Sequence, residues 1–276
     1  MQNSIRGTFH FHSTYSHDGR STLLEIASAL SGRGYSFCVM TEHFEDLDAT
    51  TFEAYVREAN AVTESTGFIL IPGVEVEVSG VHTIVFPVCS YAEVREMRWA
   101  EEDLGHPVLK VLAHPSKYPY NLIQTHLERY KIHGLELWNQ QADSSYIPPL
   151  EFLEMLKTLA PGRSLRCFFG CDLHKANLTV ANVISVPTPP QVTRDAIVEA
   201  LIKGEWASIN LPTGIEYQNG IETDLKQWLQ NVLGRSYLCP KLRQSARRCL
   251  RLFYRMLPRN AQHSLNGVKN FVRNKV

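Results

Sequence analysis

Short apolar runs rich in β-branched and aromatic residues alternate with amphipathic stretches along the first 212 residues of this 276-residue chain. Such alternation predicts the α/β class, with a parallel sheet or barrel covered by helices. We expect strands over 5–12, 36–40, 68–78, 82–88, 108–113, 134–138, 166–171 and 183–187. We expect helices near 21–32, 50–66, 91–102, 121–132, 148–160 and 191–204. The expected strands 68–78 and 82–88 are so close in sequence that only a tight connection fits between them.

Charge divides the chain into parts, although its formal net charge is zero. Residues 234–276 contain 11 Lys and Arg but no Asp or Glu, whereas residues 1–233 carry 17 basic and 28 acidic side chains, a net charge of −11. This asymmetry indicates a separate attachment function for the basic part. We predict a body over 1–212, a connecting segment over 213–233, and a basic helical tail over 234–276.

The tail contains a predicted amphipathic helix over 242–257, which Pro258 ends. Five arginines occupy one face of this helix, opposite a broad apolar face. The pattern is typical of a helix that lies in a membrane interface. It also suits a helix packed on the acidic outer wall of the body, or one that contacts nucleic acid or another protein. The three interpretations remain open.

Apolar runs, the N-terminal sequence and the cysteines indicate in which cellular compartment the protein is expected. No window approaches 18 uninterrupted apolar residues, so no transmembrane helix is expected. The N-terminal sequence MQNSIRGTFHFH lacks the apolar region of a secretory signal, and the six cysteines are scattered. We therefore expect a cytoplasmic protein with reduced thiols, with peripheral membrane attachment through the tail as an alternative. Oligomeric state is not indicated.

Histidine and acidic residues repeatedly follow the apolar strands. They are His10, His12, His43, Glu75, His82, His114, Asp172 and His174. Residues i and i+2 of a strand share a face, so two imidazoles at that spacing can reach one metal ion. A lone histidine at a strand end is more often structural than a ligand. Two such pairs with further ligand types at other strand ends make coincidence a poor explanation, and we predict a metal cluster.

The segments HFHSTYSHDG, TEH, PGVEVE followed by HTIVF, AHP, GLELWN and GCDLH resemble, in order, motifs of the PHP (polymerase and histidinol phosphatase) family. The resemblance covers residues 8 to about 175. It implies a distorted (β/α)7 TIM-like barrel that holds two or three divalent ions. The implied ligands are His10, His12, Glu75 and Asp172 for one ion, Glu75, His82 and His114 for a second, and Asp18, His43 and His174 for a third. Some members place the acid of the first motif one residue earlier, so His17 is an alternative to Asp18.

Mixed imidazole and carboxylate ligands suit Zn²⁺, Mn²⁺ or Fe²⁺ better than Mg²⁺ or Ca²⁺. Clustered ions lower the pKa of bound water, orient the hydroxide for attack and neutralise the leaving oxygen. We expect Glu75, Asp172 and His174 to act in catalysis. Arg20 and Lys117 are candidates for binding substrate phosphate, although a solvated surface role is equally open for both.

We therefore predict a metal-dependent phosphatase or phosphodiesterase that acts on a small phosphorylated metabolite or nucleotide. Histidinol phosphatase is one such activity, but no residue singles it out. The alternatives are a nuclease or oligonucleotide-trimming enzyme, which the acidic body disfavours, and a non-catalytic metal-stabilised module, which the complete ligand set disfavours. The sequence contains no nucleophile elbow and no glycine-rich phosphate loop.

Overall fold

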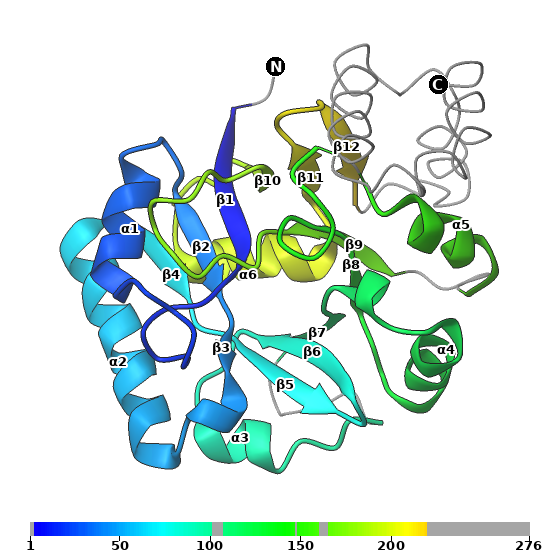
Figure 1. Cartoon of the computed structure of the whole chain (residues 1–276). Coiled ribbons are helices and arrows are strands. Elements are labelled where there is room, and N and C mark those ends of the chain that lie inside the picture. The colour runs from blue at the N-terminus through cyan, green and yellow to red at the C-terminus, as the bar shows by residue number, and fades with distance from the viewer. Residues whose placement is uncertain (1–2, 101–106, 147, 160–164, 220–276) are drawn as a thin grey trace, which may run out of the picture. The chain divides into compact units, whose positions relative to one another are not determined.

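The computed structural model describes residues 3–100, 107–146, 148–159 and 165–219, all within one compact unit. Strands and helices alternate along this part of the chain (Figure 1), which confirms the predicted α/β class. The helices are α1 (Leu23–Ser31), α2 (Ala49–Thr66), α3 (Tyr91–Arg95), α4 (Tyr120–Arg129), α5 (Leu150–Leu159) and α6 (Arg194–Lys203), with short 3-10 turns η1 (Phe44–Asp46) and η2 (Pro115–Lys117). None of the described helices is long and apolar enough to cross a membrane. The tail over 234–276, with its predicted helix, lies outside the described residues.

The first sheet has six strands in the order β12-β11-β10-β1-β2-β4. Their bounds are β1 (Ser4–Phe11), β2 (Phe37–Met40), β4 (Ile69–Ile71), β10 (Asn182–Pro187), β11 (Ala207–Asn210) and β12 (Ile215–Gln218). The strands β1, β2 and β4 are parallel, whereas β10, β11 and β12 add to β1 as an antiparallel edge. The last strand, β12, lies in the predicted connecting segment.

The second sheet also has six strands, in the order β3-β5-β6-β7-β8-β9. Their bounds are β3 (Glu42–His43), β5 (Val74–Val78), β6 (Val81–Phe86), β7 (Leu109–Leu112), β8 (Gly134–Asn139) and β9 (Arg166–Gly170). The predicted tight connection is a two-residue turn at Ser79 and Gly80, both with positive φ, which joins β5 to the antiparallel β6. The pairs of strands β7 with β8 and β8 with β9 are parallel.

The prediction of a single strand over 68–78 is wrong. The run divides at Pro72 and Gly73 into β4, which ends the first sheet, and β5, which belongs to the second. Proline has no N–H for a ladder, and a side chain at Gly73 would crowd the Met40 carbonyl oxygen and Phe86 Cβ. The break matters for function because it carries Glu75 into the second sheet.

The two sheets do not form one closed ladder in the described part of the chain, but they meet at the end of β1. The Cys171 N–H donates to the Phe9 carbonyl at 2.8 Å, and the His12 N–H donates to the Leu173 carbonyl at 2.9 Å. On the other side, β2 continues through Thr41 directly into β3 of the second sheet. The ends of β1, β3 and β9 are thereby brought together.

A bulge at His10 reverses the faces of β1. The pairing with β2 shifts between Phe9 and Phe11, and His10 has φ 69°. Phe9 packs with residues from both sheets, including Phe168, whereas Phe11 packs with the helices α1 and α2 and residues of β2 and β4. In a regular strand these two phenylalanines would share one face. His10 and His12 therefore converge through a bulge and not through plain alternation.

Candidate metal centre

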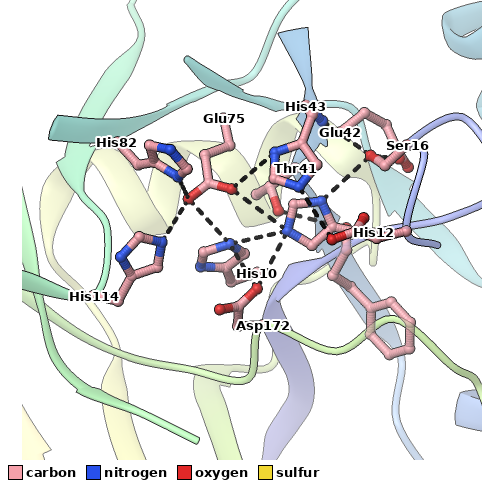
Figure 2. A network of polar contacts seen from close by, with 12 residues as sticks. His10, His12, Ser16, Thr41, Glu42, His43, Glu75, His82, His114 and Asp172 are labelled. Carbon is pink, nitrogen blue, oxygen red and sulfur yellow. Dashed lines mark hydrogen bonds and ion pairs between the residues drawn. The ribbon is translucent and has the colours of Figure 1, made fainter. Parts of the chain in front are cut away.

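The predicted ligands come from chain segments that meet at one place in the molecule. They are His10 and His12 at the end of β1, Asp18 between β1 and α1, His43 in β3, Glu75 in β5, His82 in β6, His114 after β7, and Asp172 and His174 after β9. Because β6 runs antiparallel to β7, its first residues lie beside the end of β7, where the Ala113 N–H donates to the His82 carbonyl at 3.0 Å. Figure 2 shows the side chains around Glu75 pointing toward one another.

Glu75 lies at the centre of this cluster. Its Oε1 is 2.9 Å from His114 Nε2 and 3.1 Å from His82 Nδ1, and its Oε2 is 3.3 Å from His43 Nδ1. The side chain is buried, which alone would raise its pKa. The neighbouring imidazoles of His10, His114 and His82 nevertheless hold the pKa of Glu75 well below its usual range. One ionised carboxylate thus faces histidines of several strands, as a ligand shared between cations would.

The rings of His10 and His12 meet at a second point of the cluster. Their Nε2 atoms lie 3.1 Å apart, and each is 3.4 Å from Asp172 Oδ1 and 3.6 Å from an oxygen of Glu75. Burial alone would raise the pKa of Asp172, but the neighbouring imidazoles of His10 and His12 hold it well below its usual range. Two imidazole nitrogens and two carboxylates therefore share one small volume.

The opposite ring nitrogens of these histidines are already occupied. His10 Nδ1 is 2.9 Å from Glu136 Oε1, and because a carboxylate only accepts, this nitrogen carries a proton. His12 Nδ1 is 3.3 Å from Ser16 Oγ, and the Ser16 hydroxyl donates its hydrogen bond to Glu42 at 2.7 Å. In the neutral rings both Nε2 atoms are then acceptors, and a divalent cation satisfies them together with the carboxylates. The donor set fits such an ion.

A proton competes with a cation for this position. Burial lowers the pKa of His10, but the carboxylates of Glu136, Asp172 and Glu75 together hold it well above its usual value. Burial lowers the pKa of His12 to about 4. A metal ion bound at this point would compete with that proton, the usual linkage between ligand protonation and metal affinity.

A third set of side chains lies beside His12. Asp18 Oδ2 is 2.9 Å from His174 Nε2 and 3.5 Å from His43 Nε2. The ring of His12 stacks on both of these histidines, with centroid distances of 4.4 Å to His43 and 4.6 Å to His174. The alternative ligand His17 is 67 % exposed and its Nδ1 lies 2.8 Å from Asp46 Oδ2. The structure thus places Asp18 and not His17 within this set.

Four overlapping groups have ligand atoms within 4.8 Å of one another. They are His12, Asp18, His43 and His174; His10, His114 and Asp172; His10, His12 and Glu75; and Glu75, His82 and His114. Each of the nine side chains predicted as metal ligands belongs to at least one group. In addition, the Nδ1 atoms of His43 and His82 face Glu75 at 3.3 Å and 3.1 Å without the geometry of a hydrogen bond. A cation bound between these nitrogens and the carboxylate would satisfy both sides.

Backbone strain concentrates in the same place. Among the described residues, four other than glycine have positive φ: His10, Ser79, His114 and Asp172. Ser79 belongs to a tight turn, whereas the other three carry side chains of the cluster. Such conformations cost about 1–3 kcal/mol each and persist where surrounding structure imposes them, commonly at functional sites.

Glu136 and Glu42 are buried carboxylates that the sequence did not place in the site. Glu136 Oε1 accepts from His10, as described, and its Oε2 accepts from the His114 N–H at 2.6 Å and from Asn139 Nδ2 at 3.0 Å. Asn139 thus contacts Glu136 next to the cluster. Burial raises the pKa of Glu42 to about 7 despite hydrogen bonds from Ser16 and Ser13.

The two candidate phosphate-binding residues differ in placement. Lys117 lies in η2, directly after His114, and its Nζ is 3.8 Å from Asp172 Oδ2 while the side chain is 48 % exposed. Arg20 is exposed, and its backbone N–H donates to the His174 carbonyl at 2.8 Å. Both residues border the cluster, and the ion pair brings Lys117 nearer to it.

Two cysteines and one further histidine of the described residues belong to none of these groups. Cys167 and Cys171 are fully buried, and burial raises the pKa of Cys167 to about 12, so both are core thiols. His126 is buried against Thr83, with its Nε2 3.1 Å from the hydroxyl. These groups serve packing.

No family model and no curated protein matches the sequence. Several solved structures are similar in fold. PsfC from Pseudomonas syringae is 17% identical with a TM-score of 0.49, and the alignment covers 84% of this chain and 98% of that one. A protein from Bifidobacterium adolescentis assigned as a metal-dependent phosphoesterase is 13% identical with a TM-score of 0.43, covering 71% and 95%. Endonuclease Q, in complex with a 27-mer duplex that has an abasic lesion at the active site, is 19% identical with a TM-score of 0.49, covering 87% and 68%.

The motifs HFHSTYSHDG, TEH, PGVEVE, AHP and GCDLH contribute side chains to one cluster. The chain resembles the PHP family. Because these TM-scores stay below 0.5, the function is inferred from the chain's own residues.

Proposed function

We propose that this chain is a metal-dependent phosphoesterase that hydrolyses the phosphate ester of a small metabolite or nucleotide. One observation carries the proposal: the Nε2 atoms of His10 and His12 and the carboxylates of Glu75 and Asp172 face one another at 3.1–3.6 Å. Only a cation or shared protons can stabilise so many acceptors in a buried volume. Imidazole and carboxylate ligands together favour Zn²⁺, Mn²⁺ or Fe²⁺.

We assign the ligands to three adjacent positions. His10, His12, Glu75 and Asp172 form the first, and Glu75 is shared with the second, which His82 and His114 complete. Asp18, His43 and His174 form the third, and the packing of His12 against the latter two supports this grouping. Two or three ions can be held in this way.

We also propose that the strands around this centre form the distorted seven-stranded barrel of the PHP type. The ring would run through β1, the continuous β2–β3 segment, β5, β6, β7, β8 and β9. The hydrogen bonds that join Phe9 to Cys171 and His12 to Leu173 support closure between β9 and β1. The active site would then lie at the end of the barrel formed by the loops after the strands, where such enzymes place it.

When bound, such ions lower the pKa of a coordinated water and stabilise negative charge on a phosphoryl group. The chain's own residues would orient the reaction. Glu75 holds the histidines of two positions in register, and Asp172 lies between His10, His12 and Lys117. His174 is 26 % exposed and its Nε2 faces Asp18 at 2.9 Å, so a substrate would reach the third position from this side. Lys117 is placed to bind a phosphate oxygen as a point charge.

The acidic body bears on the choice of substrate. A net charge of −11 over residues 1–233 repels a polyanion, so we place a small phosphate ester ahead of an oligonucleotide. A panel of p-nitrophenyl phosphate, bis-p-nitrophenyl phosphate and a short single-stranded oligonucleotide separates phosphatase, phosphodiesterase and nuclease activity. The panel is run with Mn²⁺, Zn²⁺ and Fe²⁺ supplied separately. Faster cleavage of the oligonucleotide than of both small esters would favour the nuclease.

Metal content gives a direct test. Purified protein should contain at least about two transition-metal ions per chain, as a clustered hydrolytic site requires. Elemental analysis measures the content, and dialysis against a chelator should remove both the ions and the activity together. Protein that is free of metal after reconstitution, or hydrolysis that persists unchanged after the ions are removed, would contradict the proposal.

Lys117 should contribute to substrate binding more than to the metal centre. We expect Lys117→Ala to lower kcat/KM about ten- to hundredfold, because a hydrogen bond to a charged group contributes about 1.5–3 kcal/mol. Steady-state kinetics on the best substrate of the panel measures the loss, and metal content should stay at the wild-type value. Loss of metal in this variant would show that Lys117 supports the cluster instead.

A further inference from the structure

Two buried carboxylates flank the cluster from different strands. Glu136 lies in β8, and Glu42 lies in β3 next to His43. Both are fully or almost fully buried, and neither belongs to a group whose ligand atoms converge. Both nevertheless accept several hydrogen bonds from groups that carry or adjoin ligands. Burying a carboxylate is costly unless it is well paired, so these two positions call for an explanation.

Glu136 acts on two histidines at once. Its Oε1 accepts from His10 Nδ1, and its Oε2 accepts from the backbone N–H of His114, which has φ 29°. The carboxylate therefore fixes the orientation of the His10 ring. It also holds the strained backbone of His114, which determines where the His114 ring points. Gly170 of β9 leaves the necessary space, because a Cβ there would overlap Glu136 Oε1.

Glu42 acts on the opposite side through Ser16. The Ser16 hydroxyl donates to Glu42 at 2.7 Å, and it accepts from the His43 N–H at 2.9 Å and from His12 Nδ1 at 3.3 Å. Two further hydrogen bonds from the Ser13 N–H hold the carboxylate in place. Because the Ser16 hydroxyl donates its hydrogen bond to Glu42, its oxygen is free to accept hydrogen bonds from His12 and His43.

We propose that Glu136 and Glu42 are positioning residues that support separate parts of the metal centre. Glu136 fixes the orientation of the His10 ring and the backbone of His114. Through His114 it supports the second metal position, which consists of Glu75, His82 and His114. Glu42 acts through Ser16, which contacts the His12 ring and the backbone of His43. Through His43 it supports the third metal position, which consists of Asp18, His43 and His174. The inference rests on the proposed metal-dependent function. It adds that metal binding at the two outer positions, the second and the third, is separately controlled.

Two histidines, one in each outer position, can report on the ions independently. His82 contacts Glu75 and His174 contacts Asp18, and neither has a contact with Glu136 or Glu42 among the hydrogen bonds described. Apo protein labelled with ¹⁵N-histidine is titrated with Zn²⁺, and the imidazole resonances are followed by NMR. Spectra of His82→Gln and His174→Gln assign the two signals.

We expect Glu136→Gln to weaken Zn²⁺ binding reported by His82 about 10–100-fold, the usual cost of losing such a supporting partner. Binding reported by His174 should remain near the wild-type value. Glu42→Gln should show the reverse pattern. Because either buried substitution could impair folding, Ser16→Ala and Gly170→Ala provide second variants that keep both carboxylates: the first removes only the hydroxyl between Glu42 and its two histidines, and the second puts a Cβ where the Glu136 carboxylate lies.

The control is Glu53→Gln, which removes an exposed carboxylate of α2 and should leave both titrations unchanged. If every variant weakens both reporters equally, or if none weakens either while the wild type binds Zn²⁺, the separate roles are overturned and the proposed function stands. A wild-type protein in which neither reporter responds to Zn²⁺ overturns the proposed function and this inference with it.

Discussion

Glu75→Gln should reduce kcat/KM about 10³-fold or more, because shared metal ions contribute several kcal/mol to stabilising the transition state and each 1.36 kcal/mol is tenfold. The carboxylate of Glu75 lies within 3.6 Å of five histidines, and no other carboxylate of the cluster contacts as many. An amide has one oxygen and no charge, so it cannot balance two cations. The variant should also retain fewer metal ions than the wild type, which elemental analysis would measure.

The same measurement on Glu53→Gln controls for loss of a carboxylate elsewhere on the chain, and its kcat/KM should equal that of the wild type. The comparison with Lys117→Ala is decisive for the assigned roles. A shared ligand affects two ions, whereas a phosphate-binding lysine contributes one charged contact. Wild-type turnover in Glu75→Gln together with complete loss in Lys117→Ala would show that the roles are assigned wrongly.

The ligand positions could be predicted because strand ends and motif order locate them without knowledge of the tertiary structure. His114 and Asp172 each follow a short apolar run, and the ends of neighbouring parallel strands lie at one edge of a sheet. The reasoning for His10 and His12 was incomplete. It assumed plain alternation, whereas the rings converge because a bulge with positive φ interrupts β1 at His10. No feature of the sequence marks such a bulge at a histidine.

The supporting groups could not be predicted for a different reason. Glu136 lies inside the predicted strand 134–138, and its role depends on contacts with His10 and with the backbone of His114, more than 20 residues away. Glu42 precedes a ligand and reads as an ordinary strand-end acid until Ser16 is placed beside it. Long-range hydrogen bonds of this kind leave no periodic pattern.

The bounds of helices were easier to predict from the sequence than those of strands. The helices α1, α2 and α6 were predicted within a few residues, because their apolar spacing and end residues are local properties. The helix predicted over 91–102 ends at Arg95 as α3. The division at Pro72 was missed, since the apolar run continues across it and periodicity alone favours one strand. The short β11 and β12 were also missed; their pairing with β10 depends on the sheet that the rest of the chain has formed.

The packing beneath the cluster leads to the second large effect. Phe168 of β9 is fully buried and stacks on Phe9 of β1 with a centroid distance of 4.5 Å, so it joins the two sheets at the residue before His10. It also lies 4.4 Å from the ring of Trp206 and meets Phe86 edge-on at 6.0 Å. Aromatic contacts of this kind contribute beyond the area that they bury.

Phe168→Ala should therefore lower the free energy of unfolding by about 3–5 kcal/mol, the usual cost of a large cavity in a core. A loss of that size is a large fraction of the total stability of a domain, about 5–15 kcal/mol. Urea unfolding of metal-free protein, followed by far-ultraviolet circular dichroism, measures the change without a contribution from bound ions. Tyr146→Ala is the matched control, because that ring is 56% exposed and its removal should change the free energy of unfolding by less than about 0.5 kcal/mol. Equal effects of the two substitutions would show that the rings around Phe168 do not hold β1 against β9, and the close approach of His10 to Asp172 would then need another cause.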